Sequence, residues 1–151
     1  AADTLVGKVV RIVDGDTIVV ESEDTRYRVR LAAIDSPEKN QPWGESATRS
    51  LRRILAGQEV RIDWYKKDRW KRLIGYVWVA PPDCTTCGYT LDAGMYQLTV
   101  GMAWHFKRYA HEQSPEQRGQ YEFAEVEARA KKSGLWSDPE PMPPWEWRKE
   151  H

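Results

Sequence analysis

The sequence predicts an α+β domain in which a small β-barrel carries about three helices, and the order of its residue patterns is the reason. Runs rich in β-branched residues fill most of residues 6–34 and 58–80, whereas helical spacing dominates residues 45–57 and the region after residue 91. The chain has 151 residues and shows no internal repeat or linker. We therefore expect a single domain over residues 1–151.

The first three strands are predicted to form a meander. VGKVVRIV and DTIVV, within Val6–Val20, are joined by an Asp-Gly dipeptide that suits a tight hairpin turn. The polar ESEDT separates this hairpin from a third strand over roughly residues 26–34. Short connections of this kind place consecutive strands side by side.

The third predicted strand ends in a charged bend. In RVRLAAIDSPE, residues 28–38, arginines alternate with apolar residues, so a pleated strand sends the arginines to one face and the apolar residues to the core. Pro37 lacks a backbone donor and stops the ladder of strand hydrogen bonds. Asp35 and Glu38 should therefore lie on a rigid bend at the end of the strand.

One helix and two more strands complete the predicted barrel. ESATRSLRRILAG, residues 45–57, has apolar residues at helical spacing and ends at a glycine. QEVRIDWYKK and RLIGYVWVA are interpreted as strands on either side of the basic stretch KKDRWKR, residues 66–72. Three meandering strands, a helix and two strands is the order expected of a five-stranded OB barrel.

The remaining sequence predicts helices followed by an irregular tail. Residues 91–103 are helical by pattern, and Ser-Pro-Glu-Gln at residues 114–117 is a capping box that should open a helix ending near Lys132. Beyond it lies a tail rich in proline and tryptophan, at about residues 137–151. We expect its prolines to prevent regular structure.

The overall charge predicts neither a nucleic-acid partner nor a membrane partner. Lys plus Arg and Asp plus Glu are 23 each, so any nucleic acid must be recognised locally, and the mean hydropathy of −0.74 indicates a soluble chain. The basic stretch at residues 66–72 is one such local feature, with five basic residues around a tryptophan. Its first two lysines equally suit a solvated hairpin edge.

Two cysteines, Cys84 and Cys87, form a CTTC motif that three interpretations fit. They are a local disulfide, a redox pair, or half of a zinc site completed by His105 and His111. The sequence shows no βαβ context for a redox pair, and the histidine spacer is long for a zinc finger. The chain opens AAD, which suits a mature product of signal cleavage, so we expect a secreted or periplasmic protein.

Carboxylates and arginines recur in three separated motifs, and together they suit phosphodiester hydrolysis. They are Asp16 in VDGDT, Arg30, Asp35 and Glu38 in RLAAIDSPE, and Arg72 in DRWKR. Oxygen ligands suit a hard cation such as Ca²⁺, guanidinium groups offset charge on phosphoryl oxygens, and a free carboxylate can orient or deprotonate water.

These motifs resemble those of the staphylococcal-nuclease-like (thermonuclease) family, from about Val6 to Trp136. DGDT, R-L-x-x-x-D-[ST]-P-E and D-x-x-x-R occur here in family order. The resemblance implies an OB-fold phosphodiesterase that cuts DNA and RNA to leave 3′-phosphate ends. It also implies a monomer and a Ca²⁺ cofactor.

The resemblance assigns a role to each matching residue. It implies that Asp16, Asp35 and the backbone carbonyl of Ser36 bind Ca²⁺, that Glu38 acts on the attacking water, and that Arg30 and Arg72 clamp the scissile phosphate. The chain departs from the family where Arg69 and Trp70 replace a lysine and a tyrosine, and among the later aromatics only Tyr109 aligns clearly. These three residues are the predicted nucleic-acid contacts.

A noncatalytic OB-fold module that binds nucleic acid or protein is the alternative, because a fold alone does not fix an activity. A binding module would need none of the carboxylates. The complete set of five residues, Asp16, Arg30, Asp35, Glu38 and Arg72, therefore favours an enzyme.

Overall fold

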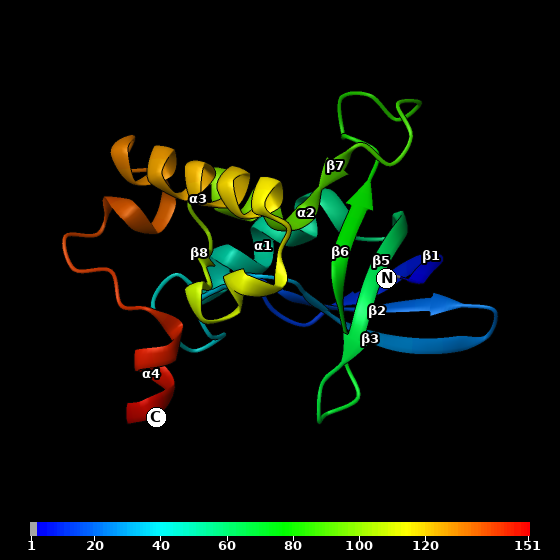
Figure 1. Ribbon diagram of the computed structural model, residues 1–151, viewed down its shortest axis with the longest axis horizontal. Helices are drawn as coiled ribbons and strands as arrows, with labels where there is room; N and C mark the ends of the chain where they lie inside the picture. Colours follow the sequence, from blue (N-terminus) through cyan, green and yellow to red (C-terminus); the bar gives the residue numbers. More distant parts are fainter. Residues whose placement is uncertain (1–2) are drawn as a thin grey trace.

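Five long strands close into the barrel at the centre of the computed structural model, which describes residues 3–151. They are β1 (Asp3–Ile12), β2 (Thr17–Ser22), β3 (Thr25–Leu31), β5 (Glu59–Lys67) and β6 (Leu73–Val79). The strand order is β3-β2-β1-β5-β6-β7, and a parallel pairing of β3 with β6 closes the barrel (Figure 1). The predicted fold class is confirmed.

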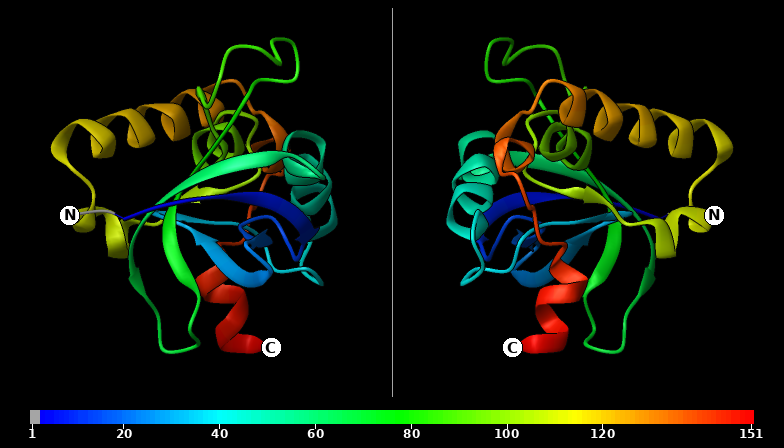
Figure 2. Two further views of the ribbon diagram at one scale, coloured as in Figure 1. Left: turned by 90° about the vertical axis from the view of Figure 1, so that its right-hand side faces the viewer. Right: turned by 90° about the vertical axis from the view of Figure 1, so that its left-hand side faces the viewer.

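Helices and short strands surround one end of the barrel (Figures 1 and 2). The helices are α1 (Gly44–Leu55), α2 (Ala93–Thr99), α3 (Pro115–Ala130) and α4 (Pro144–Glu150), with 3₁₀ turns η1 (Lys107–Glu112) and η2 (Gly134–Ser137). The short strands are β4 (Ile34–Asp35), β7 (Leu91–Asp92) and β8 (Trp104–His105). Within residues 3–151, none of these helices has the length and apolar content that would let it cross a bilayer.

The core has two parts. Apolar residues of the barrel strands, α1 and α2 form the larger part, with Val9, Ile18 and Leu51 almost completely buried. A smaller cluster holds the C-terminal region, in which the ring of Trp104 lies 4.4 Å from Trp136. Residues 131–151, which follow α3, form no strand, and the burial of these aromatic rings holds this part of the chain against the rest of the domain.

Two predicted element boundaries are wrong. The third strand was expected to run to about residue 34, but β3 ends at Leu31 and Ala33 takes a left-handed φ of 64° before β4 begins. The helix expected over residues 91–103 is shorter in the structure. It begins at Ala93, because the side chain of Asp92 caps it by accepting hydrogen bonds from the backbone N–H groups of Gly94 and Met95. It ends at Thr99, shortly before Gly101 takes a left-handed φ of 74°.

The predicted irregular tail is also wrong in part, because Pro144 begins the helix α4. Proline is favoured in the first turn of a helix, where its missing N–H group would have no partner. Trp145 of α4 packs edge-on against Trp104 at 5.3 Å, so a tryptophan of the tail joins the smaller core. The capping box expected at Ser114 does form at the start of α3.

The structure excludes the zinc-site alternative. Cys84 and Cys87 form a disulfide in the connection between β6 and β7. His105 is 1% exposed, and its Nε2 lies 2.7 Å from Oε1 of Gln113. No group of three metal-ligating His, Cys, Asp or Glu side chains occurs among residues 3–151.

We predict that His105 makes folding sensitive to acid. Its burial lowers the pKa of the imidazole, so the unfolded chain binds a proton more readily than the folded one. The stability that this histidine contributes is complete above its unfolded pKa of about 6.5 and is lost as the pH falls below that value.

The measurement is the urea unfolding free energy of wild type and His105→Phe between about pH 7.5 and about pH 5. We expect the difference between the two proteins to shift in favour of the variant as the pH falls. His151→Phe, an exposed position, is the control, and a difference for His105→Phe that does not change with pH would contradict the prediction.

Candidate active site

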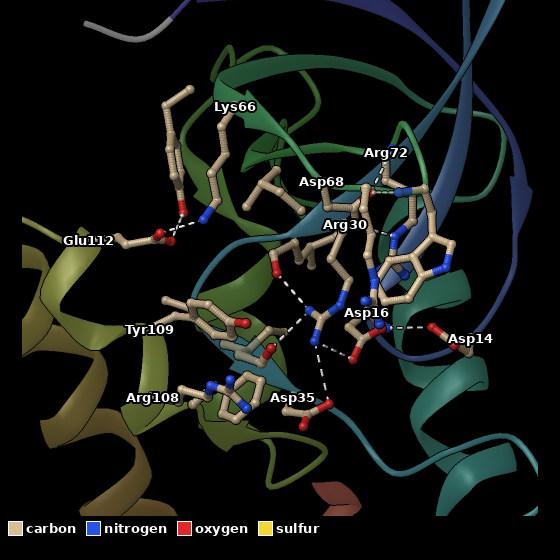
Figure 3. Close-up of a pocket in the computed structure, with 18 of the residues that line it drawn as sticks. Asp14, Asp16, Arg30, Asp35, Lys66, Asp68, Arg72, Arg108, Tyr109 and Glu112 are labelled. Atoms are coloured by element: carbon tan, nitrogen blue, oxygen red, sulfur yellow. Dashed lines mark hydrogen bonds and ion pairs between the residues drawn. The ribbon is translucent and has the colours of Figure 1, made fainter. Parts of the chain in front are cut away.

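An open pocket of about 730 Å³ lies at one end of the barrel, and all five residues of the predicted constellation line it. The pocket lining includes Asp16, Arg30, Asp35, Glu38 and Arg72. The predicted nucleic-acid contacts Arg69, Trp70 and Tyr109 line the same pocket. Figure 3 shows Tyr109 among the labelled lining residues. Residues that are distant in sequence therefore share one cavity.

Strand register brings the first two motifs together. Thr17 of β2 pairs with Arg30 of β3, and the backbone N–H of Leu31 donates to the carbonyl of Asp16 at 2.9 Å. The parallel pairing of β3 with β6 sets Arg30 opposite Ile74, which places Arg72 at the start of the neighbouring strand. Closure of the barrel is thus what positions both arginines.

Arg30 links the bend of the chain to the carboxylates (Figure 3). Its Nη1 donates to the carbonyls of Leu31 and Ile34, each at 2.8 Å. Its Nη2 lies 3.4 Å from Oδ1 of Asp35 and 3.4 Å from Oδ2 of Asp16. One guanidinium therefore stabilises the turn between β3 and β4 and the negative charge beside it.

Asp16 is buried among groups that favour its ionised form. Its Oδ1 accepts from the hydroxyl of Thr17 at 3.1 Å, and its Oδ2 accepts from the backbone N–H of Ser36 at 2.9 Å. Burial opposes ionisation, but the charge of Arg30 and these hydrogen bonds outweigh it and hold the pKa of Asp16 below its ordinary value. These neighbours favour a negative charge on Asp16 at the buried end of the pocket.

Asp14 has a structural part in the same hairpin. Its Oδ1 accepts the backbone N–H of Asp16 at 3.0 Å, as an aspartate in a turn often does. Burial raises the pKa of Asp14 to about 8, and the neighbouring charge of Asp16 adds to this effect. Asp14 is the aspartate of the Asp-Gly dipeptide that was predicted to form the hairpin turn, and this hydrogen bond agrees with that prediction.

Asp35 and Ser36 complete the buried end of the pocket, and each is 1% exposed. Burial raises the pKa of Asp35 to about 6, against the opposing effect of its arginine partners. The hydroxyl of Ser36 donates to the carbonyls of Gly15 and Met102 at 3.1 and 3.0 Å. These bonds fix the bend against both the hairpin turn and the segment after α2.

The donor set suits a hard divalent cation. Asp16 and Asp35 both lie within ion-pair distance of the same nitrogen, Nη2 of Arg30. Two carboxylates are therefore close to each other beside one positive charge. Carboxylate and carbonyl oxygens are the ligands that Ca²⁺ takes, with water completing a small protein set. Asp16, Asp35 and the carbonyl of Ser36 therefore fit such an ion by their chemistry.

Asp68 holds one edge of the guanidinium of Arg72. Its Nε donates to Oδ2 of Asp68 at 2.7 Å, and its backbone N–H donates to Oδ1 of the same residue at 3.0 Å. Within residues 3–151, its two terminal nitrogens have no hydrogen-bond partner. Its guanidinium lies 5.3 Å from the ring centre of Trp70, so the planar group is oriented but retains free donors.

The predicted general base Glu38 and the predicted aromatic contacts Trp70 and Tyr109 are more exposed than the buried carboxylates. The side chain of Glu38 is 32% exposed, and its backbone N–H donates to Oε1 of Gln41 at 2.9 Å. Trp70 and Tyr109 are 54% and 36% exposed, which leaves aromatic surface available at the pocket. Their contact with nucleic acid stays a prediction.

Sequence reasoning missed Arg148 of α4, which also lines the pocket. Its Nη2 donates to Oδ2 of Asp35 at 2.7 Å, and its Nη1 lies 3.7 Å from Oε1 of Glu38. The signal that could have found it is Pro144, since a proline followed by helix-forming residues is a helix start. Nothing in the sequence indicates where that helix packs.

A second missed group joins Tyr65, Lys66 and Glu112 on the wall of the pocket. The hydroxyl of Tyr65 donates to Oε1 of Glu112 at 3.1 Å, and Lys66 forms an ion pair with Oε2 of the same carboxylate. Burial, with the nearby charge of Glu112, raises the pKa of Tyr65 above its ordinary value. Lys66 is therefore paired within the pocket, which the solvated-edge interpretation did not anticipate.

Comparison with known proteins identifies the class. The family described as Staphylococcal nuclease homologue matches residues 28–138. The chain belongs to this family, and it is a nuclease, a hydrolase of nucleic acid. Both the predicted family and the predicted enzyme class are confirmed.

Three relatives show how far the similarity extends. A protein of Shigella flexneri named Micrococcal nuclease is 42% identical over 146 residues, which cover 95% of this chain and 80% of the relative. Protein ParB of Escherichia coli is 39% identical over 144 residues, covering 95% and 79%. A protein of Escherichia coli O157:H7 named Uncharacterized endonuclease is 35% identical over 142 residues, covering 94% and 84%.

We predict that Arg30→Met lowers the free energy of unfolding by about 3–5 kcal/mol, the usual cost of removing one partner from a buried charge network. The variant leaves Asp16 and Asp35 without this cation and leaves two carbonyls without a donor. Urea denaturation at neutral pH measures the loss.

Arg26→Met is the matched control, because its ion pair with Glu21 is exposed on both sides and should contribute within about 0.5 kcal/mol. Equal stability of the Arg26 and Arg30 variants would mean that the guanidinium of Arg30 is not needed to hold the bend.

Proposed function

We propose that this chain is a Ca²⁺-dependent, sugar-nonspecific nuclease that hydrolyses phosphodiester bonds of DNA and RNA and leaves 3′-phosphate ends. The observation that carries the proposal is the convergence of Asp16, Arg30, Asp35, Glu38 and Arg72 on one pocket. Family membership supports the nuclease chemistry, and so does the name of the relative called Micrococcal nuclease. The Ca²⁺ requirement and the 3′-phosphate ends rest on the resemblance of the motifs and on the oxygen ligands of the pocket.

The arginines stabilise charge on the phosphate. Arg72 offers terminal nitrogens while Asp68 holds its Nε, an arrangement that suits bidentate binding of a phosphoryl group. Arg30 is fixed by two carbonyls and adds positive charge at the buried end. Both guanidinium groups are already held in place before the substrate binds. Their positive charges can therefore stabilise the negative charge that develops on the phosphoryl oxygens without a costly rearrangement.

Glu38 is the proposed general base, which takes a proton from the attacking water. Its carboxylate is partly exposed at the pocket, unlike the buried Asp16 and Asp35, so water can reach it. Attack of that water on phosphorus breaks the P–O5′ bond, with the proton of the water passing to Glu38 and the 5′ oxygen taking a proton from solvent. This route leaves the phosphate on the 3′ end.

Asp16, Asp35 and the backbone carbonyl of Ser36 would hold the Ca²⁺. When bound, a divalent cation supplies positive charge against the phosphoryl oxygens. The protein contributes fixed oxygen ligands, because hydrogen bonds to Thr17 and Ser36 hold the carboxylate of Asp16 in one orientation.

Trp70, Arg69 and Tyr109 are the proposed contacts for nucleotides. Arg69 stacks over the ring of Trp70 at 4.3 Å, which joins a cation to an exposed aromatic face. Bases of both DNA and RNA have π-faces that stack on such rings. Stacking and phosphate charge use features that DNA and RNA share, which supports action on both polymers.

We predict that cleavage requires Ca²⁺ and is weak with Mg²⁺, because Mg²⁺ demands near-octahedral coordination that a small, irregular oxygen set does not supply. Plasmid nicking and RNA degradation by the same protein sample, in Ca²⁺, Mg²⁺ or EDTA, measure this. End-labelling before and after phosphatase treatment identifies the product ends. Equal turnover in Mg²⁺ would contradict the ligand assignment, and binding without cleavage under every metal would favour the noncatalytic module.

We also predict that Glu38→Gln lowers the cleavage rate by about 10²-fold to 10⁴-fold, the usual contribution of general acid-base catalysis. The change keeps the shape of the side chain, so affinity for single-stranded DNA in Ca²⁺ should be largely retained. Glu45→Gln is the control, since Glu45 is exposed on α1 and pairs only loosely with Arg49 at 3.9 Å. A Glu38→Gln rate equal to wild type would show that another group handles the water.

A further inference from the structure

Arg148 joins the C-terminal helix α4 to the carboxylates of the proposed nuclease site. Its two terminal nitrogens reach both oxygens of Asp35, Nη1 at 3.2 Å from Oδ1 and Nη2 at 2.7 Å from Oδ2. This is a bidentate, charge-assisted pair, the strongest form of arginine-carboxylate contact. A guanidinium from the end of the chain therefore occupies both ligand atoms of one proposed metal ligand.

α4 is also held by contacts that do not involve Arg148. The ring of Trp145 stacks on Phe106 with 5.4 Å between centres and 4° between planes. Just before the helix, the carbonyl of Met142 accepts a hydrogen bond from Nε2 of Gln41 at 2.6 Å. Figures 1 and 2 show α4 on the same side of the barrel as the connection between β5 and β6. The helix is thus anchored by packing while its arginine reaches into the pocket.

The two arginines that contact Asp35 differ in how freely they can move. Arg30 has 14% of its side chain exposed and is tied to two backbone carbonyls. Arg148 has 40% of its side chain exposed, and its partners within residues 3–151 are the carboxylates of Asp35 and Glu38. Arg148 is therefore the more exposed of the two partners, and its side chain, unlike that of Arg30, makes no hydrogen bond to the backbone within residues 3–151.

We propose that Arg148 is an internal counter-ion that competes with the divalent cation for Asp35 and so sets the affinity of the site for that cation. The inference rests on the proposed function, because it concerns the same cation site. The guanidinium fork and a cation require the same carboxylate oxygens, so binding of the cation at Asp35 must displace at least one arm of the fork. Part of the cation's binding free energy is spent on that displacement.

Calcium titration calorimetry on the full EDTA-treated chain, without nucleic acid, tests this directly. We expect Arg148→Gln to bind Ca²⁺ about tenfold to a hundredfold more tightly than wild type, the range that follows from losing a hydrogen-bonded contact to a charged group. Arg148→Lys should lie between the two, because it keeps the charge but cannot form the fork.

Lys149→Gln is the matched control for net charge. It removes one positive charge from the same helix, but Lys149 is 70% exposed and pairs with Glu146 outside the pocket. Its affinity for Ca²⁺ should stay within about twofold of wild type, as expected for a screened surface charge.

Thermal melting gives a second measurement that does not depend on calorimetry. Without cation, Arg148→Gln should melt below wild type, since Asp35 loses a partner, and saturating Ca²⁺ should remove that difference. If Arg148→Gln fails to fold, the comparison of Arg148→Lys with wild type still decides the question. Affinity that is unchanged or weaker in both Arg148 variants would overturn the proposal and make Arg148 a positioning residue for Asp35.

The outcome also separates this inference from the proposed function. Cation binding of equal strength in wild type and the Arg148 variants would overturn the competition alone and leave the cation site standing. No Ca²⁺ binding by any of these proteins would overturn the proposed cofactor and, with it, the competition.

Discussion

The guanidinium of Arg30 is the contact on which the geometry of the site depends. It donates to two carbonyls of the turn between β3 and β4 and, at the same time, lies beside Asp16 and Asp35. The turn includes Ala33 with a positive φ, a conformation that a residue with a side chain rarely adopts without support. Arg30 supplies that support and also offsets the charge that the turn brings together.

The charge balance of the pocket follows from this contact. Burying carboxylates costs free energy unless cations and donors compensate for the lost water. Asp16 has Arg30, Thr17 and the N–H of Ser36, whereas Asp35 has Arg30 and Arg148. The raised pKa of Asp35, about 6, indicates that its compensation is the less complete of the two.

Strand closure explains why the residues of the site come from separate motifs. Asp16 ends the hairpin turn before β2, Arg30 lies on β3, and Arg72 precedes β6. Pairing of β3 with β2 on one side and with β6 on the other brings the three together. The apolar residues of these strands, such as Val29 and Val77, are completely buried, so the same packing that closes the barrel also positions the polar groups at its end.

The sequence by itself determined the five long strands of the barrel, apart from the end of β3, the first hairpin and the five residues of the constellation, because alternation, turn residues and motif spacing are local properties of the chain. It could not determine the left-handed Ala33, the helix at Pro144 or the place of Arg148. Those features depend on contacts between distant segments: the carbonyls that Arg30 binds, the ring of Phe106 beneath Trp145, and the carboxylate of Asp35. Local patterns show which residues face the core and which face the solvent. Only the packing of distant segments decides which of these residues come into contact.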